Sequence, residues 1–249
     1  MSKSIEQQKL LRVLNATEKE LAFIDKLNEA EIENLRLKTS EQIELNQSEL
    51  WERFAKVAKF MPNFVNAKVA ETILGAMITA NLSYYIPVKD AVAVLQYLSI
   101  NFLVEVTEHI IPEKCPALIN AISIKILSKV TKQLIAQKKF FTAAAFVDVC
   151  DLDKIMILSN DIHREEDLIA ISKFVENKKA IAKIVERFDN KRLEKIILKA
   201  YEINEQEELF IVFVELNSNA IQKVLFVIQQ MHSDNQTMIL KDFESRIQR

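Results

Sequence analysis

The residues of this sequence most able to do chemistry are basic and lie between positions 173 and 199, where lysine and arginine recur every four residues. Side chains four apart share one face of a helix, so each series can present three cations together. The two series are Lys179, Lys183 and Arg187, and Lys191, Lys195 and Lys199. Binding of nucleic acid, or of an anionic ligand such as a lipid headgroup, through residues 173–199 is therefore one hypothesis.

Acidic residues interrupt the same stretch and leave two other interpretations open. Glu176, Glu186 and Glu194 lie among the cations, and no aromatic or glycine pattern indicates contacts to bases. The stretch can also be a solvated, salt-bridged face. Alternatively, it can be a docking face for an acidic protein.

Residues that catalyse reactions or bind metals follow no recognisable pattern. The three histidines stand far apart, and none belongs to an HExxH motif. Cys115 and Cys150 each lie in an apolar stretch, which is typical of buried, reduced thiols. We therefore expect no enzyme activity, no cofactor and no bound metal.

The elements that carry these residues are predicted to be helices, because the chain has one glycine and four prolines in 249 residues. Sheets, tight turns and phosphate-binding loops need more glycine than Gly75 alone supplies. The net charge of -2 provides no global positive field, so any binding to nucleic acid or an anionic membrane has to be local. The N-terminus lacks a signal-peptide profile, and the most apolar run, residues 73–80, is shorter than the roughly 20 residues that span a bilayer. We expect a cytoplasmic protein without a membrane span.

Residues 1–61 have the pattern of an N-terminal amphipathic arm. Apolar residues at three- and four-residue steps predict a long helix over residues 5–37, whose narrow stripe with imperfect heptads is open to coiled-coil pairing. A polar stretch and a second stripe follow, so the two segments form either a helical hairpin or one long arm. The second stripe consists of Leu50, Phe54, Val57 and Met61, and Pro62 ends it.

Three residues of the arm are candidates for binding a partner. Leu14 and Leu21 belong to the first apolar stripe. Trp51 stands among charged residues, as an exposed aromatic anchor in a partner's groove would. Self-association through the N-terminal helix is a further expectation.

The strongest feature of the sequence is an internal repeat after residue 62. Ile86-Pro87-Val88-Lys89 recurs as Ile111-Pro112-Glu113-Lys114, and each copy is followed by an apolar run that begins at a serine, Ser99 or Ser123. Proline suits the first turn of a helix and serine suits an N-cap, so each unit of about 25 residues is predicted to be a pair of short helices. Asp151, Asp189 and Asn217 are expected as N-caps of later helices, and the last segment, 233–249, as a polar capping helix. The fold predicted for residues 62–249 is a short α-solenoid of stacked helical hairpins.

The two Ile-Pro-x-Lys segments and their paired helices resemble the N-terminal cytoplasmic domain of MgtE-type magnesium transporters. That domain is similar to the helical domains of the flagellar switch protein FliG, and the resemblance covers about residues 62–231 at the level of fold. It implies a superhelix of short hairpins. No position matches the acid-rich, ion-sensing surface of the family, and we expect no magnesium transport from this chain alone.

A non-enzymatic adaptor or scaffold is the function that these patterns favour. A helical repeat offers a continuous surface to protein partners, and the N-terminal amphipathic helix offers a stripe for helix pairing. The alternative is the binding of nucleic acid or an anionic ligand through the basic helices of residues 173–199.

Overall fold

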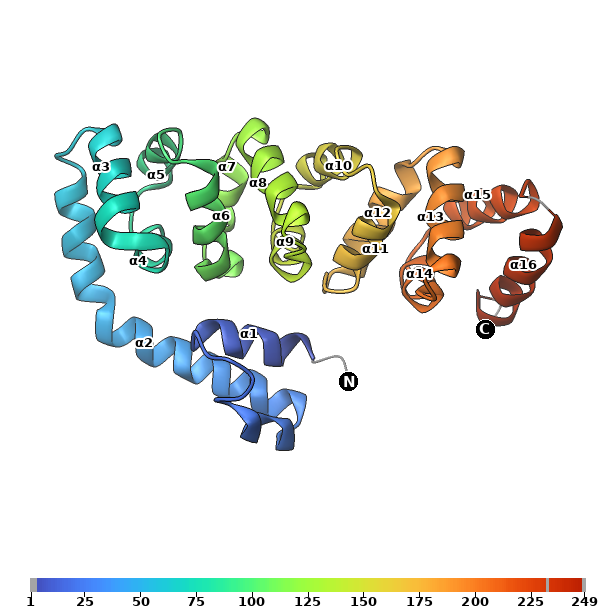
Figure 1. The fold of residues 1–249 in the computed structure, drawn as a ribbon, viewed down its shortest axis with the longest axis horizontal. Coiled ribbons are helices and arrows are strands. Elements are labelled where there is room, and N and C mark those ends of the chain that lie inside the picture. The colour runs from blue at the N-terminus through green and yellow to red at the C-terminus, as the bar shows by residue number, and fades with distance from the viewer. Residues whose placement is uncertain (1–3, 232, 248–249) are drawn as a thin grey trace. The chain divides into compact units, whose positions relative to one another are not determined.

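The structure, a computed structural model, describes residues 4–231 and 233–247, with side chains for all of these except 44–47, 233–235 and 247. It is all-α, as predicted, and the described residues contain no strand (Figure 1). The chain divides into two compact units, Met1–Ala121 (unit 1) and Ile122–Arg249 (unit 2). The division falls between two helices of the predicted repeat region.

Unit 1 contains seven α-helices in its described part, joined by short turns and three short irregular helices. The α-helices are α1 (Ile5–Val13), α2 (Glu29–Ala58), α3 (Asn63–Val69), α4 (Gly75–Leu82), α5 (Val88–Leu95), α6 (Ile100–His109) and α7 (Pro116–Ala121). The irregular helices are η1 (Ala22–Lys26), η2 (Ala70–Leu74) and η3 (Pro112–Lys114). Apart from the long α2, these helices are short, and they pack on next-but-one neighbours: α2 on α4, α3 on α5, α4 on α6 and α5 on α7.

The single helix predicted over residues 5–37 is wrong, because local capping signals divide this segment. Asn15 adopts a positive φ of 47° and ends α1, a conformation that asparagine tolerates better than most residues. Asn28 and Glu31 then form a capping box that starts α2. The polar stretch between the two apolar stripes lies inside α2, which runs for 30 residues.

The N-terminal segments form a hairpin with its own small core. Leu10, Ile24 and Ile32 are fully buried, and Leu11, Leu21, Leu27 and Leu35 pack against them. The apolar stripe of the first segment is therefore largely used within the hairpin. An ion pair between Arg36 and Glu6, with a distance of 2.8 Å from Nε to Oε2, joins α2 to α1.

Residues 1–61 also pack on the helices that follow them. Helix α1 contacts α6 as well as α2, and α2 contacts α4. The Arg12 guanidinium donates hydrogen bonds to the backbone carbonyls of Thr107 and Glu108, at the end of α6. The arm is thus part of unit 1.

The helix starts that were predicted from the repeat are confirmed in the first copy, whereas in the second copy Pro112 starts a three-residue irregular helix and the α-helix, α7, begins at Pro116. Helix α5 follows Pro87, and Ser99 is the N-cap of α6, its hydroxyl accepting a hydrogen bond of 3.3 Å from the Phe102 backbone N–H. In the second copy, η3 begins at Pro112, and Ser123 is the N-cap of the next long helix. Local signals for helix initiation therefore determined these boundaries.

Unit 2 is built from nine α-helices in its described part. They are α8 (Ile124–Ala136), α9 (Phe140–Val147), α10 (Leu152–Asn160), α11 (Glu165–Ser172), α12 (Lys178–Arg187), α13 (Asn190–Glu202), α14 (Gln206–Phe213), α15 (Ser218–Gln229) and α16 (Ser233–Ile247). Asp189 and Asn217 cap α13 and α15 through their side chains, and Asp151 holds the N-cap position of α10 without a side-chain cap bond.

The helices of unit 2 pack as two interleaved stacks. One contains α8, α10, α12, α14 and α16, and the other contains α9, α11, α13 and α15. Alternation along the chain between two stacks is the packing expected of stacked hairpins. The last helix, α16, buries Ile239 and Phe243, and Phe243 contacts the rings of Phe210 and Phe213 with centroid distances of 6.4 and 6.1 Å. Helix α16 thus covers an apolar end of the core.

Candidate interaction surfaces

The two basic series lie in different stacks of unit 2. Lys179, Lys183 and Arg187 are on α12, which packs between α10 and α14. Lys191, Lys195 and Lys199 are on α13, which packs between α11 and α15. The series are therefore on helices with different neighbours, although only two residues separate α12 from α13.

Many of the cations near these helices bind structural partners. Lys173 forms an ion pair with Glu205 at 2.6 Å, and Lys178 forms one with the buried Glu208 at 2.7 Å. Arg192 donates a hydrogen bond to the backbone carbonyl of Ile162, at the end of α10. These residues connect one hairpin to the next.

The bond made by Arg192 belongs to a recurring set that we call the stitches. In three of them, a lysine or arginine in the first half of a helix binds a backbone carbonyl that follows an earlier helix. The pairs are Lys154 with Ile122, Arg192 with Ile162, and Lys223 with Phe188, which are 30 to 35 residues apart. Such cations satisfy helix C-terminal carbonyls that lack partners within their own helix.

In the other stitches, a carboxylate accepts hydrogen bonds from groups at the start of a later helix. Asp148 accepts hydrogen bonds from the backbone N–H groups of Glu176 and Asn177 at 3.1 and 2.9 Å, just before α12. Glu186 accepts one from the Asn217 side chain at 2.7 Å, at the start of α15. Asp148, and Glu186 among the acids interleaved with the cations, therefore bind groups at the start of a later helix.

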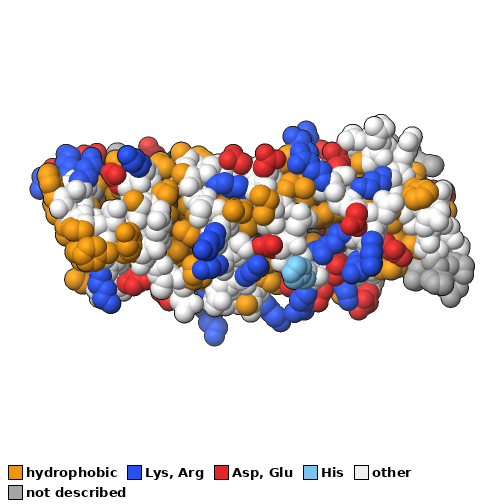
Figure 2. Space-filling view, turned by 90° about the horizontal axis from the view of Figure 1, so that it is seen from above, with side chains coloured by type: hydrophobic (Ala, Val, Ile, Leu, Met, Phe, Trp, Pro, Cys, Tyr) orange, Lys and Arg blue, Asp and Glu red, His pale blue; other side chains and the backbone are white. Residues whose placement is uncertain are grey.

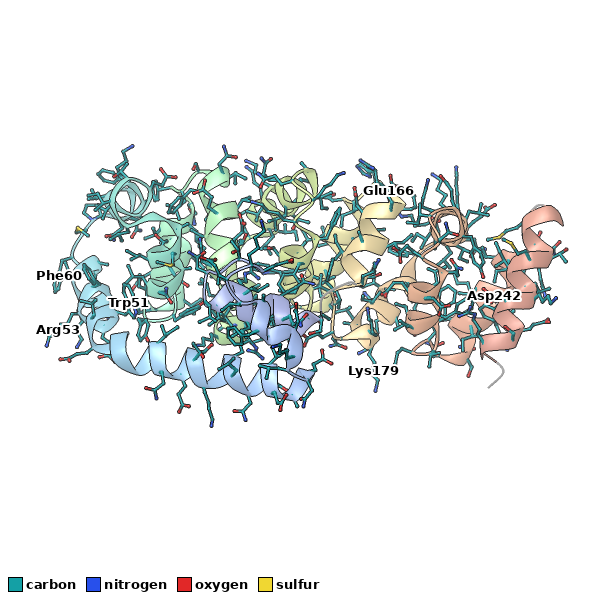
Figure 3. All side chains as sticks on the ribbon, turned by 60° about the horizontal axis from the view of Figure 1, so that its bottom comes forward. Trp51, Arg53, Phe60, Glu166, Lys179 and Asp242 are labelled. Atoms are coloured by element: carbon teal, nitrogen blue, oxygen red, sulfur yellow. The ribbon has the colours of Figure 1, made fainter. Side chains whose placement is uncertain are left out.

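Four lysines of the two series remain exposed. Lys179, Lys183, Lys191 and Lys195 have no ion pair with any residue that the structure describes. Figure 3 shows Lys179 at the edge of the ribbon, directed away from it. By contrast, Arg187 lies 3.7 Å from Asp153, and Lys199 pairs with Glu202 at 2.8 Å.

The three candidate anchors of the arm differ in exposure. Leu14 lies just after α1 with 36% of its surface exposed. Leu21 is half-buried and packs on the hairpin core. The expectation that Trp51 is an exposed anchor is wrong: only 8% of its surface is exposed. Trp51 lies on the side of α2 that packs in unit 1 (Figure 3).

Helix α2 instead exposes a neighbouring row of apolar side chains, which we call the α2 stripe. Leu50, Phe54 and Val57 are 50%, 44% and 59% exposed, and Ile43 precedes them at 39%. Their spacing of seven, four and three residues places them on one face of the helix. Trp51 and Ala55, on the adjacent face of α2, are buried.

A second exposed apolar surface lies where α2 turns into α3. Phe60 is 90% exposed in the turn, and Phe64 is 60% exposed in the first turn of α3. We call this surface, together with Lys56, Lys59 and Lys68, the α2–α3 corner. Seen from above, hydrophobic side chains gather at this end of unit 1, with basic side chains nearby (Figure 2). Ile73 in η2 and Met77 in α4 are 74% and 50% exposed.

The nucleophilic and metal-ligating groups of the structure are either buried or dispersed. Burial raises the pKa of the Cys115 thiol to about 12, and it also raises the pKa of Cys150. These thiols are therefore poor nucleophiles near neutral pH. The described residues include no group of three or more histidine, cysteine or acidic side chains that could hold a metal ion.

Comparisons with known proteins identify no relative. No family model matches the chain, and no curated protein or solved structure matches it. Within the part of the chain that the structure describes, no helix is long and apolar enough to cross a membrane.

Proposed function

We propose that this protein is a non-enzymatic adaptor or scaffold that acts in the cytoplasm and holds protein partners through its helical surfaces. The observation that carries the proposal is the α2 stripe. Its apolar side chains lie in a row on a helix that is already packed on another face. Contiguous exposed apolar surface of this kind typically marks an interaction site.

The occupant that best fits the stripe is a helix of a partner protein. Residues 43, 50, 54 and 57 follow the three-, four- and seven-residue spacing by which helices pair side by side. Helix α2 spans 30 residues, or about 45 Å, which gives a partner helix a long, regular support. The hairpin core and the Arg12 contacts fix α2 in unit 1, so little ordering is needed when a partner binds.

Affinity purification from the native cells tests this proposal. The tagged wild type is compared with a Leu50→Asp, Phe54→Asp double variant and with Phe226→Asp, a control at a residue of α15 that is 51% exposed. We expect a stoichiometric protein partner with the wild type and the control, and its loss with the double variant, because a buried charge in the interface is costly. The same partners with all three proteins would contradict the proposal.

Nucleic-acid or anionic-ligand binding by the exposed lysines of α12 and α13 is the second candidate function. It rests on Lys179, Lys183, Lys191 and Lys195, which have no intramolecular ion pair in the described structure. Backbone binding would release counterions and weaken steeply with added salt. Recovery of nucleic acid with the wild type, and its loss after Lys179→Glu and Lys183→Glu, would favour this candidate over the adaptor.

A further inference from the structure

The α2–α3 corner combines local positive charge with exposed aromatic rings. Between Arg53, which pairs with Glu49 at 2.6 Å, and Glu71, the chain has three further basic residues and no acidic residue, although its overall net charge is -2. Lys56, Lys59 and Lys68 form no ion pair with another residue of the described structure. The corner is therefore a local positive surface of the kind that the net charge alone does not reveal.

The turn between α2 and α3 is braced by hydrogen bonds from one side chain. The Asn66 side-chain amide donates hydrogen bonds of 2.8 and 3.3 Å to the carbonyls of Ala58 and Met61, across the turn. Pro62 precedes α3 and has its φ fixed by its ring. The turn that exposes Phe60 is thus stabilised by these hydrogen bonds. Figure 3 shows Phe60 at the outer edge of unit 1.

The lysines are arranged around the phenylalanines by helical spacing. Phe64 and Lys68 are four residues apart, on one face of α3. Lys56 lies in the last turn of α2, four residues before Phe60, and Lys59 directly precedes Phe60. Lysine stems can extend along an apolar surface while their ammonium groups remain in a polar layer.

We propose that the α2–α3 corner binds the surface of an anionic phospholipid bilayer, with Phe60 and Phe64 inserted at the level of the headgroups and the three lysines bound to lipid phosphates. This interaction is peripheral and goes beyond the adaptor function, because it uses residues outside the α2 stripe. Aromatic insertion combined with clustered lysines is a known physical basis for reversible membrane attachment.

The shape of the corner favours a bilayer over a protein as its occupant. A side chain that is 90% exposed, as Phe60 is, projects from the surface and lines no groove. A protein partner would need a preformed pocket for such a projection, whereas the headgroup region of a bilayer accommodates it. A row that fits a partner helix is already present in the α2 stripe, whereas Phe60 and Phe64 lie beyond the last residue of α2, Ala58.

Vesicle flotation of the full chain tests the proposal. The two probes are vesicles of phosphatidylcholine alone and vesicles of equal parts phosphatidylcholine and phosphatidylglycerol. We expect the wild type to float with the anionic vesicles and to remain unbound with the neutral ones. Added salt should weaken the binding, because lysines supply part of it.

Matched variants locate the binding surface. Phe60→Ser with Phe64→Ser should reduce partitioning at least about tenfold, and Lys59→Gln with Lys68→Gln about 25-fold, taking roughly fivefold for each lysine. The controls, Phe226→Ser on α15 and Lys125→Gln with Lys129→Gln on α8, should bind as the wild type does. All of these positions are exposed, and circular dichroism checks that each variant folds.

Several results would overturn the proposal. These are no flotation with anionic vesicles, equal flotation with neutral vesicles, or an equal loss in the control variants. A protein captured by the wild type and lost with the corner variants, without any vesicle binding, would assign the corner to an acidic protein instead. None of these outcomes affects the test of the α2 stripe, which uses other residues.

Discussion

Arg12 donates a hydrogen bond of 2.5 Å from Nη2 to the backbone carbonyl oxygen of Thr107, in the last turn of α6. A residue near the start of the chain thereby gives a hydrogen-bond donor to a C-terminal carbonyl of a helix 95 positions later. Burial lowers the pKa of the Arg12 guanidinium, and nearby acidic groups, Glu108 first, partly offset this effect. The guanidinium nevertheless stays protonated at any pH at which the protein folds.

Replacing Arg12 tests whether this contact holds the N-terminal hairpin on α6. Arg12→Met keeps the apolar stem but removes the donors, and we expect it to lower the free energy of unfolding by about 2 to 3 kcal/mol. Lys26→Met, at an exposed position of η1, is the control and should change it by less than about 0.5 kcal/mol. Urea unfolding of the three proteins gives the comparison. An Arg12→Met variant as stable as the control would show that the contact contributes little.

Two substitutions three residues apart test which face of α2 packs against the rest of unit 1. Trp51 is buried and Phe54 is 44% exposed, with their ring centroids 6.4 Å apart. Trp51→Ala should destabilise the chain by about 3 to 5 kcal/mol because it leaves a cavity. Phe54→Ala should cost about 1 kcal/mol or less. Thermal unfolding distinguishes the two, and the reverse order of stabilities would mean that α2 is rotated relative to unit 1.

The cationic stitches should contribute measurably to the stability of unit 2. Lys223 donates hydrogen bonds to the carbonyls of Glu186 and Phe188, so Lys223→Met should lower the free energy of unfolding by about 1 to 2 kcal/mol. Lys195→Met is the matched control, because Lys195 is exposed and has no partner among the described residues. Chemical denaturation that affects both variants equally would argue against a structural role for the stitch.

Asp161 is expected to make the free energy of unfolding depend on pH. Its carboxylate accepts a hydrogen bond of 2.5 Å from the Ser128 hydroxyl and lies 3.3 Å from Lys132 Nζ, and these contacts lower its pKa. A depressed folded-state pKa adds stability that is present above the unfolded pKa of about 3.9 and is lost as the pH falls through the folded value.

An Asp161→Asn variant should lack this contribution. At about pH 6 it should be less stable than the wild type, and the difference should shrink as the pH is lowered below about 4. Urea unfolding at several pH values measures the difference. A difference in the free energy of unfolding that stays constant across this pH range would show that the ionisation of Asp161 is not linked to folding.

The helix boundaries that the sequence predicted correctly are those determined by local chemistry. Pro87, Ser99, Asp189 and Asn217 act within one helical turn of their own position, so each can be recognised from the residues next to it. The break after α1 also has local signals, in Asn15 and in the Asn28–Glu31 capping box. The continuous apolar periodicity of that region obscured them.

The surfaces were harder to predict because burial depends on which neighbour a helix meets. Helix α2 carries two apolar rows, one with Trp51 and Ala55 and one with Leu50 and Phe54, and periodicity does not distinguish them. Likewise, Arg192 and Lys199 look alike in sequence, but the first binds a carbonyl 30 residues away and the second pairs with Glu202 in its own helix. Only the tertiary structure separates these roles.

The stitches of unit 2 also bear on how this half of the chain responds to force. Each joins residues 28 to 35 positions apart, so each connects one hairpin to the following one. Stretching unit 2 from its ends would apply force to these bonds in series. We therefore expect the hairpins to detach one at a time. We expect force–extension curves of this half to show several small unfolding steps and not one large unfolding event.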